Sequence, residues 1–374
     1  MKFSVFSTDL LKQLQIAGGA IVVNPVLPIL EDFLFSIENN SLSITASDLE
    51  TTITTRLEVK SNANGQVAIP ARILMETIKA LPNQSINFSI NDSTYGIEIT
   101  SSYGKYKLAG RSVEDYPKTK DLDAADQVAI NSDALQKGIA KTIFATSNDD
   151  LRPAMTGVYF QVDFNKVTFV ATDAHKLVKY TFNGIKSDVS TSFIVPKKAL
   201  NLLKNALPNE AEVEVSFNKT NAFFSFDNTR ITCRLIDARY PDYNAVIPVN
   251  NPNLLIVNRV DFQNSLKRIA IYANKTTNQV TLHISPDSLT ISSQDVDFSN
   301  EATEQLTCSY TGDPVVIGFN AKFLVEMLGI LQSDEVKLEL STPTRAGILL
   351  PSEEGENESI FMLIMPVMLS VSAP

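Results

Sequence analysis

The chain has 374 residues, of which 44% are hydrophobic, 20% are charged and 8% are aromatic, and this balance excludes a disordered or fibrous protein. Its net charge of −10 argues against a protein that binds nucleic acid over its whole surface, because neutralising phosphates requires lysine and arginine. Residues 1–6 lack the apolar stretch of a signal peptide, and no run of about 20 apolar residues predicts a membrane helix. The two cysteines, Cys233 and Cys308, form no metal-binding motif, so we expect a cytoplasmic protein without a membrane segment.

The first third of the chain predicts two helices and several strands. Asp9 precedes apolar residues at helical spacing, so residues 8–20 are expected to form a helix with this aspartate as its N-cap. Residues 42–45 alternate apolar and polar side chains, which is typical of a strand, and residues 86–90 do the same. A second helix is expected over residues 71–81, directly after a proline.

The same succession of elements returns twice. In the second third it comprises Asp133 with residues 132–146, residues 167–170, residues 197–207 and residues 213–217; in the last third it comprises Asp261 with residues 261–275, residues 289–292 and residues 320–332. Pro70, Pro196 and Asn320 lie at equivalent places, 126 and 124 residues apart, and three such periods fill the chain. We therefore predict three diverged repeats.

Each repeat is expected to be an α+β unit, with two helices packed on one face of an antiparallel sheet. The first repeat covers residues 1–120, the second covers residues 127–249 and the third covers residues 253–374. Polar, turn-forming segments at residues 118–126 and 248–253 would join them.

The third repeat ends in a Met-rich apolar segment, residues 360–369. Its first half is expected to be a core strand, and the part after Pro366 should leave the sheet because proline cannot donate a hydrogen bond. Methionine adapts to several partners, so this tail is also a candidate partner-binding segment. Residues 352–358, which are rich in glutamate, are interpreted as the solvated tip of a hairpin.

The sequence contains no recognisable catalytic, phosphate-binding or metal-binding motif. Asp48, Asp173 and Asp295 follow equivalent strands in the three repeats, and a catalytic group is rarely needed three times, so a structural role in turns is expected. One alternative is a hydrolase in which His175, next to Asp173, is the base, but no nucleophile lies near His175 in sequence. We expect no enzyme activity, no metal and no cofactor.

Charge is divided unevenly between the predicted elements. The six predicted helices together carry +7, which leaves −17 for the remaining chain. If the six helices share one surface, that surface is basic on an acidic protein and would suit nucleic acid. The alternative is that these charges only cover exposed helix faces, which does not account for the difference in sign.

Several motifs occur in a fixed order along the whole chain. They are Met1-Lys2-Phe3, Leu27-Pro28-Ile29-Leu30, Ala171-Thr172-Asp173-Ala174-His175-Lys176-Leu177, Tyr240-Pro241-Asp242-Tyr243 and Met365-Pro366-Val367-Met368-Leu369. Together with the threefold repeat they resemble the bacterial replicative sliding clamp, the beta subunit of DNA polymerase III. The resemblance implies the DNA-clamp fold and a head-to-tail homodimer that closes into a six-unit ring with its helices lining the hole. It implies a processivity factor that encircles double-stranded DNA without sequence preference and tethers the replicative polymerase.

The resemblance also implies three sets of functional residues. A hydrophobic pocket between the second and third repeats would bind peptides from DNA polymerase III subunits, the clamp loader, repair polymerases and other clamp-motif proteins. Its residues would be Met155, Thr172, His175, Leu177, Pro241, Val246, Asn320, Phe323, Met365, Pro366 and Leu369. Residues facing DNA would be Lys12, Arg72, Lys79, Lys137, Lys141, Lys197, Lys198, Lys204, Lys267 and Arg268. The dimer interface would pair Tyr106 and Leu108 with Ile271 and Tyr272 of the second copy.

Three positions depart from the pattern of this family. Asn24 replaces an arginine before Pro25, Pro153-Ala154 replaces a pair of tyrosines, and Ala245 replaces an arginine before Val246. The first two changes weaken the expected contact with DNA at the edge of the ring, and the third alters the expected polar rim of the pocket. The main alternative function is a repeat scaffold for protein–protein interaction that does not bind DNA.

Overall fold

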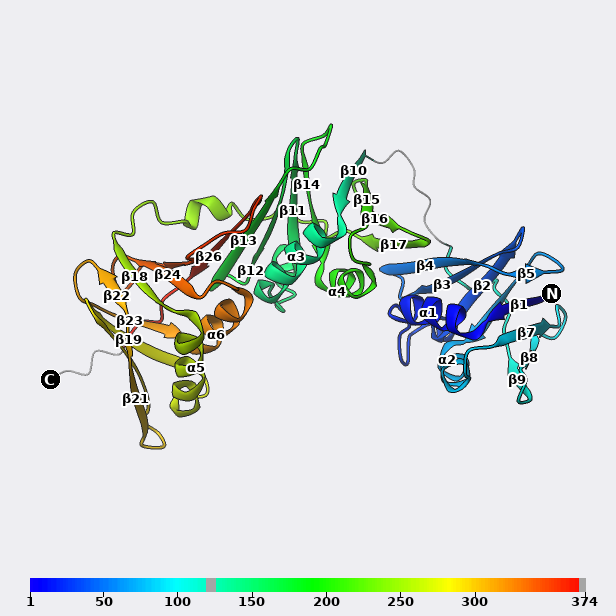
Figure 1. The fold of residues 1–374 in the computed structure, drawn as a ribbon, viewed down its shortest axis with the longest axis horizontal. Coiled ribbons are helices and arrows are strands. Elements are labelled where there is room, and N and C mark those ends of the chain that lie inside the picture. The colour runs from blue at the N-terminus through cyan, green and yellow to red at the C-terminus, as the bar shows by residue number, and fades with distance from the viewer. Residues whose placement is uncertain (119–125, 370–374) are drawn as a thin grey trace. The chain divides into compact units, whose positions relative to one another are not determined.

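We describe residues 1–118 and 126–369 in a computed structural model; most of the predicted connector at residues 118–126 and the last five residues of the third repeat lie outside the described residues. Six α-helices lie within the described part, two in each predicted repeat, which confirms the six helices expected from the sequence (Figure 1). They are α1 (Ser7–Gly18), α2 (Ala71–Ala80), α3 (Ser132–Thr142), α4 (Lys197–Ala206), α5 (Arg259–Ile269) and α6 (Ala321–Ile330).

The predicted aspartate N-caps are wrong. Asp9, Asp133 and Asp261 lie inside the first turn of α1, α3 and α5. The Asn258 side chain caps α5 by accepting a hydrogen bond from the backbone N–H of Asp261 at 3.0 Å, and Asn131 accepts one from Asp133 at 2.8 Å. Carboxylates are favourable in the first turn because they face the positive end of the helix dipole, which explains why aspartate recurs there without being the cap.

The chain divides into two compact units. The first contains the described part of residues 1–135 together with residues 198–235, and the second contains residues 136–197 and the described residues from Ile236 onward. These units do not follow the predicted repeats, because strands of neighbouring repeats join the same sheet.

Two antiparallel sheets build the first compact unit. The five-stranded sheet has, in order, β5 (Lys60–Ser61), β1 (Lys2–Phe6), β7 (Ser85–Ile90), β8 (Gly96–Thr100) and β9 (Lys105–Ala109). The eight-stranded sheet has β10 (Asp126–Asn131), β15 (Glu212–Phe217), β16 (Asn221–Phe226), β17 (Thr229–Arg234), β4 (Thr51–Glu58), β3 (Ser41–Ser47), β2 (Asp32–Glu38) and β6 (Gly65–Pro70). The first and second repeats meet where β17 pairs with β4, with Ile231 opposite Ile53.

Two further antiparallel sheets build the second compact unit. The nine-stranded sheet has β14 (Thr191–Pro196), β11 (Gly157–Asp163), β12 (Lys166–Thr172), β13 (Lys176–Asn183), β26 (Glu358–Ile364), β25 (Gly347–Pro351), β24 (Glu335–Leu340), β18 (Asn253–Asn258) and β22 (Ser309–Thr311). The four-stranded sheet has β21 (Asn300–Thr307), β20 (Ser288–Asp295), β19 (Gln279–Ser285) and β23 (Val315–Asn320). The second and third repeats meet where β13 pairs with β26, with Leu177 opposite Leu363.

Each helix buries the apolar face that the periodicity predicts. In α1, Leu10, Leu14 and Ala17 are fully buried, and this helix packs against β3 and β4. In α5, Phe262 and Leu266 are equally buried, and the helix packs against α6 and the strands β20 and β21. Burial of apolar area of this kind is the main stabilising term of such a layered fold. Among the described residues, no helix combines the length and the hydropathy that a membrane crossing requires.

Candidate functional site

The turn between β12 and β13 presents His175 to solvent. The Thr172 hydroxyl donates a hydrogen bond to the backbone oxygen of Lys176 at 2.8 Å. One oxygen of Asp173 accepts the backbone N–H groups of His175 and Lys176, each at 2.9 Å. Ala174, between them, adopts a left-handed backbone with φ of 76°. The turn is therefore fixed by its own hydrogen bonds, and the His175 side chain stays exposed on top of it.

The same aspartate turn occurs at the equivalent strand ends. Asp48 accepts the backbone N–H groups of Glu50 and Thr51 after β3, at 3.0 and 2.5 Å. Asp295 accepts the N–H of Asp297 at the end of β20, at 3.2 Å. The predicted structural role of the three aspartates is confirmed. The Asp173 carboxylate is occupied by turn N–H groups and by a lysine, so it does not act on the imidazole of His175 as a hydrolase would require.

A buried lysine that sequence reasoning missed lies below His175. The Lys176 side chain is only 5% exposed, and its Nζ lies 2.8 Å from Asp173 Oδ2 and 3.4 Å from Glu326 Oε2. The same Nζ lies 4.0 Å from the centre of the Phe323 ring, as in a cation–π contact. The His175 ring lies over Phe323 as well, with 6.3 Å between ring centres. Lys176 therefore ties β13 to α6.

The C-terminal segment completes this side of the site. The Met365 backbone N–H donates to the His175 oxygen at 2.8 Å, and the Val367 N–H donates to the Gly318 oxygen at 2.8 Å. A Cβ atom at Gly318 would come within 2.7 Å of the backbone oxygen of Val367, so a larger residue would push the tail away from β23. The first half of the Met-rich segment is the strand β26, as predicted. The tail then leaves that sheet and pairs with the edge of the four-stranded sheet, which was not expected.

An apolar cluster forms the other side of the candidate site. Leu177 is 2% exposed and packs with Ala154, Tyr240, Tyr243 and Leu363. The Tyr240 ring stacks on Tyr159 with 4.5 Å between centres, and its hydroxyl donates to the Val170 oxygen at 3.3 Å. Burial raises the pKa of this tyrosine well above its ordinary value, so the ring behaves as a neutral apolar group.

All eleven predicted pocket residues lie in the second compact unit. Contacts bring together His175, Phe323 and Met365, and Leu369 lies beside Gly318 of β23. Asn320, the N-cap of α6, accepts the backbone N–H of Lys322 at 3.0 Å. Leu177 on β13 belongs to the apolar cluster itself. The remaining residues are Thr172 on β12, Met155 in the 3-10 helix η3 (Pro153–Thr156), Val246 in η4 (Tyr243–Val246), Pro241 directly after Tyr240, and Pro366 in the tail.

The ten predicted DNA-facing residues differ in how they are held. Five of them form ion pairs: Arg72 with Glu76, Lys137 and Lys141 with Glu358, Lys198 with Asp48, and Arg268 with Glu304. Arg268 binds both oxygens of Glu304, at 2.7 and 2.6 Å, and holds the pKa of that carboxyl below its ordinary value. The other five have no carboxylate within ion-pair distance in the described part of the chain: Lys12, Lys79, Lys197, Lys204 and Lys267.

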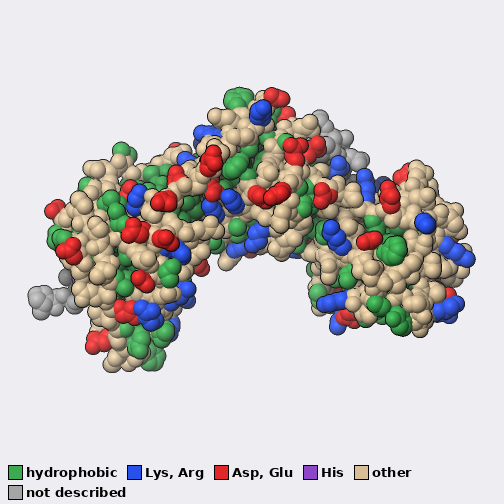
Figure 2. All heavy atoms as spheres, viewed as in Figure 1, with side chains coloured by type: hydrophobic (Ala, Val, Ile, Leu, Met, Phe, Trp, Pro, Cys, Tyr) green, Lys and Arg blue, Asp and Glu red, His purple; other side chains and the backbone are tan. Residues whose placement is uncertain are grey.

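Only some of the predicted DNA-facing side chains therefore carry a positive charge that no carboxylate of the described residues neutralises. In Figure 2 acidic and basic side chains are intermingled on the face that is drawn. Exposed pairs such as Arg72 with Glu76 are weak and exchange readily with other partners. The five unpaired lysines lie on α1, α2, α4 and α5, so free positive charge occurs on helices from all three repeats.

Two of the predicted dimer residues lie on an edge strand, and the other two lie in a short helix that packs against another edge strand. Tyr106 and Leu108 are half-buried on β9, which among the described strands pairs with β8 alone and so forms one edge of the five-stranded sheet. Ile271 and Tyr272 lie in η5 (Ala270–Tyr272) and are 65% and 43% exposed. This short helix packs against β20 and β21, and β21 is the edge of the four-stranded sheet. Large exposed apolar side chains beside unpaired edges are typical of interfaces.

Comparison with known proteins identifies the family. Models of the N-terminal, central and C-terminal domains of the DNA polymerase III beta subunit match residues 1–120, 129–242 and 244–368. The beta sliding clamp of Vibrio cholerae serotype O1 is 27% identical over 99% of this chain and 100% of its own length. That of Pseudomonas aeruginosa is also 27% identical, with the same coverage.

Solved structures agree with this match. The DNA polymerase III subunit beta of Pseudomonas aeruginosa is 26% identical with a TM-score of 0.94, over 99% of this chain and 100% of that one. The sliding clamp of Bartonella birtlesii, solved bound to griselimycin, is 28% identical with a TM-score of 0.92 and the same coverage. The three-domain α+β clamp fold and the resemblance found in the sequence are confirmed. The chain belongs to the DNA polymerase III beta subunit family, the bacterial sliding clamps, and is a non-catalytic processivity factor.

Proposed function

We propose that two copies of this chain close head to tail around duplex DNA and slide along it, in the cytoplasm, while the pocket beside His175 tethers the replicative polymerase. The observation that carries this proposal is the set of unpaired lysines on α1, α2, α4 and α5 of a chain whose net charge is −10. Lysine ammonium groups bind the phosphate backbone of any sequence, and they bind it weakly when few act together. A closed ring does not need tight binding, because its topology prevents dissociation.

Ring closure has support in the two unpaired edges. The edge strand β9 carries Lys105 and Lys107, and the edge strand β21 carries Glu301 and Glu304. If β9 of one copy met β21 of the other, both edges would be paired and opposite charges would face each other. The apolar pairs Tyr106 with Leu108 and Ile271 with Tyr272 would lie in the same contact. A head-to-tail contact of this kind closes into a ring when the rotation allows it.

The residues of the predicted pocket have the composition expected for peptide binding. Leu177 and its cluster offer an apolar floor, while Met365 and Phe323 offer adaptable and aromatic side chains at the rim. We expect short peptides with apolar anchors, from DNA polymerase III subunits, the clamp loader and repair polymerases, to bind there. His175 then serves as a lining residue and not as a base.

The experiment that tests this function uses a circular plasmid. The protein is loaded on nicked circular DNA, the complex is isolated, and the plasmid is then cut once. A topological ring stays on the uncut circle and runs off the ends of the linear product. Retention after cutting would contradict sliding, and failure to stay on the uncut circle would favour the alternative of a protein scaffold that does not bind DNA.

A further inference from the structure

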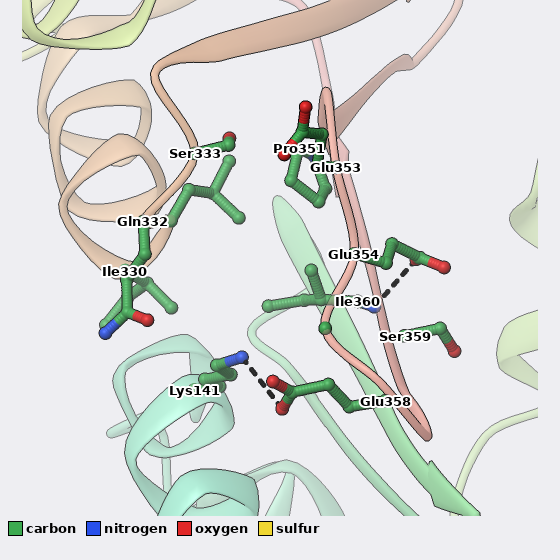
Figure 3. A pocket seen from close by; sticks show the side chains of 12 residues that line it. Lys141, Ile330, Gln332, Ser333, Pro351, Glu353, Glu354, Glu358, Ser359 and Ile360 are labelled. Atoms are coloured by element: carbon green, nitrogen blue, oxygen red, sulfur yellow. Dashed lines mark hydrogen bonds and ion pairs between the residues drawn. The ribbon is translucent and has the colours of Figure 1, made fainter.

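A small cavity of about 130 Å³ lies between α3, the end of α6 and the hairpin of β25 and β26 (Figure 3). Its lining includes Lys141, Ile330, Ser333, Glu354 and Glu358, and in Figure 3 the Lys141 ammonium group points at the Glu358 carboxylate. The tip of this hairpin, residues 353–357, is exposed, as expected for a solvated tip. Glu358 departs from that expectation, because its side chain is only 15% exposed.

Three donors converge on the Glu358 carboxylate. The Tyr180 hydroxyl of β13 donates to Oε2, and the Lys141 Nζ lies 3.3 Å from the same oxygen. The Lys137 Nζ lies 3.4 Å from Oε1. Burial alone would raise the pKa of Glu358, but the hydroxyl and the two ammonium groups outweigh it and lower the pKa below the ordinary value of 4.5. The carboxylate is therefore ionised at neutral pH.

The two lysines do not have the same freedom. Lys141 is 19% exposed and lies 4.8 Å from the centre of the Tyr180 ring, so it is held on both sides. Lys137 lies one turn earlier on α3, is 52% exposed, and contacts only the outer oxygen of the carboxylate. Because the Lys137 side chain is open to solvent and holds the carboxylate by a single contact, its ammonium group exchanges readily with other anions. Lys137 can thus turn from Glu358 to a phosphate, whereas Lys141 stays in place.

We propose that Glu358 is a built-in counterion that competes with DNA phosphate for Lys137 and so weakens the contact between α3 and DNA. This inference rests on the proposed function, because it requires α3 to face the duplex. When Lys137 releases a phosphate, the Glu358 carboxylate beside it takes the place of that phosphate. The competition therefore lowers the barrier to sliding along DNA. Lys141 acts as a positioning residue that holds the carboxylate, and not as a DNA contact.

The test measures the salt dependence of binding to a short labelled duplex by fluorescence anisotropy, with the full chain. Glu358→Gln keeps an acceptor for the Tyr180 hydroxyl but removes the charge. Freeing one ammonium group should steepen the slope of log K against log salt by about 0.9, so that raising salt from about 50 to 200 mM weakens this variant about 3.5-fold more than wild type. Thermal unfolding of each variant checks that it is folded.

Two further variants separate this mechanism from a change in net charge. Glu354→Gln removes the same charge from the same hairpin, but Glu354 contacts the backbone N–H of Ile360 and no lysine among the described residues. It should bind DNA as wild type does. In a Lys137→Gln background, Glu358→Gln should have no effect on the slope.

Each contrary result would overturn the inference. The control Glu354→Gln could steepen the slope equally, or the effect of Glu358→Gln could persist without Lys137. A third contrary result is that neither wild type nor Glu358→Gln binds the duplex at the lowest salt. The plasmid experiment reports on encirclement separately, so wild type that stays on the circle while Glu358→Gln shows no change would reject the counterion and keep the clamp.

Discussion

Two aspartate turns place a residue with a Cβ atom in the left-handed region of the backbone. Ala174 has φ of 76° beside Asp173, and Leu49 has φ of 79° beside Asp48. Only glycine adopts this conformation freely, and other residues lose roughly 1–2 kcal/mol there. In each turn the aspartate carboxylate accepts hydrogen bonds from the backbone N–H groups two and three residues later, and these bonds hold the turn strongly enough to tolerate the strain.

Replacing Ala174 by glycine should therefore stabilise the protein. The relief of strain exceeds the added entropy of the unfolded chain, so Ala174→Gly should raise the free energy of unfolding by about 0.5–1 kcal/mol. Chemical denaturation monitored by circular dichroism measures the change. The matched control is Ala63→Gly, since Ala63 is exposed in a loop and is not among the residues with positive φ, so it should lose stability. If Ala174→Gly lost stability as the control does, the claim that Ala174 is strained would be rejected.

For single residues, the sequence predicts a role in a local turn better than it predicts a contact with a residue far away in the chain. The turn role of Asp173 was predictable because the residue recurs once per repeat. The partners of Lys176 and Glu358 were not, because Glu326 lies 150 positions from the lysine, and Tyr180 lies 178 positions from the glutamate. A buried charge is recognised only once its partner is known to be near.

The helix α6 and the tail after β26 together form one side of the candidate pocket. Phe323 is the shared contact, since it lies beneath both the His175 ring and the Lys176 ammonium group. It is half-buried, so its loss should affect stability less than a core substitution does. Aromatic side chains in such positions often dominate peptide binding.

The substitution Phe323→Ala should weaken binding of a short polymerase-derived peptide with apolar anchors by about tenfold, which corresponds to about 1.4 kcal/mol. Fluorescence anisotropy with a labelled peptide gives the dissociation constant. Phe298→Ala is the control, because this phenylalanine is 74% exposed in a turn of the same compact unit and lies outside the pocket. Equal peptide affinity of the Phe323 variant and wild type would place the peptide elsewhere.

Helices and strands were predictable element by element, but the sheets were not. The apolar faces of α1 and α5 follow from spacing alone, so all six helices were found. The pairing of β4 with β17 and of β13 with β26 joins strands far apart in sequence. Period-2 alternation shows that a strand has one buried face, yet it does not name the neighbouring strand. For this reason the second repeat is divided between the two compact units.

At the scale of the whole molecule, the proposed ring depends on two edges that carry opposite charge. Lys105 on β9 already pairs with Glu98, and Glu304 on β21 pairs with Arg268. Lys107 and Glu301 are exposed and form no ion pair in the described part of the chain, so these two are the charges left to attract a second copy. Like charges that face each other across an interface weaken it, and opposite charges also direct the partners into register.

Reversing one of these charges should open the ring, and reversing both should close it again. Lys107→Glu is expected to weaken the dimer about tenfold or more, and the double variant Lys107→Glu with Glu301→Lys should recover most of the loss. Sedimentation equilibrium at several protein concentrations measures the dissociation constant. Lys60→Glu changes the same charge on β5, the opposite edge of the same sheet, and should leave the dimer unchanged. A wild-type chain that stays monomeric at micromolar concentration would reject the ring, whereas a Lys107→Glu dimer as tight as wild type would reject only this pairing of edges.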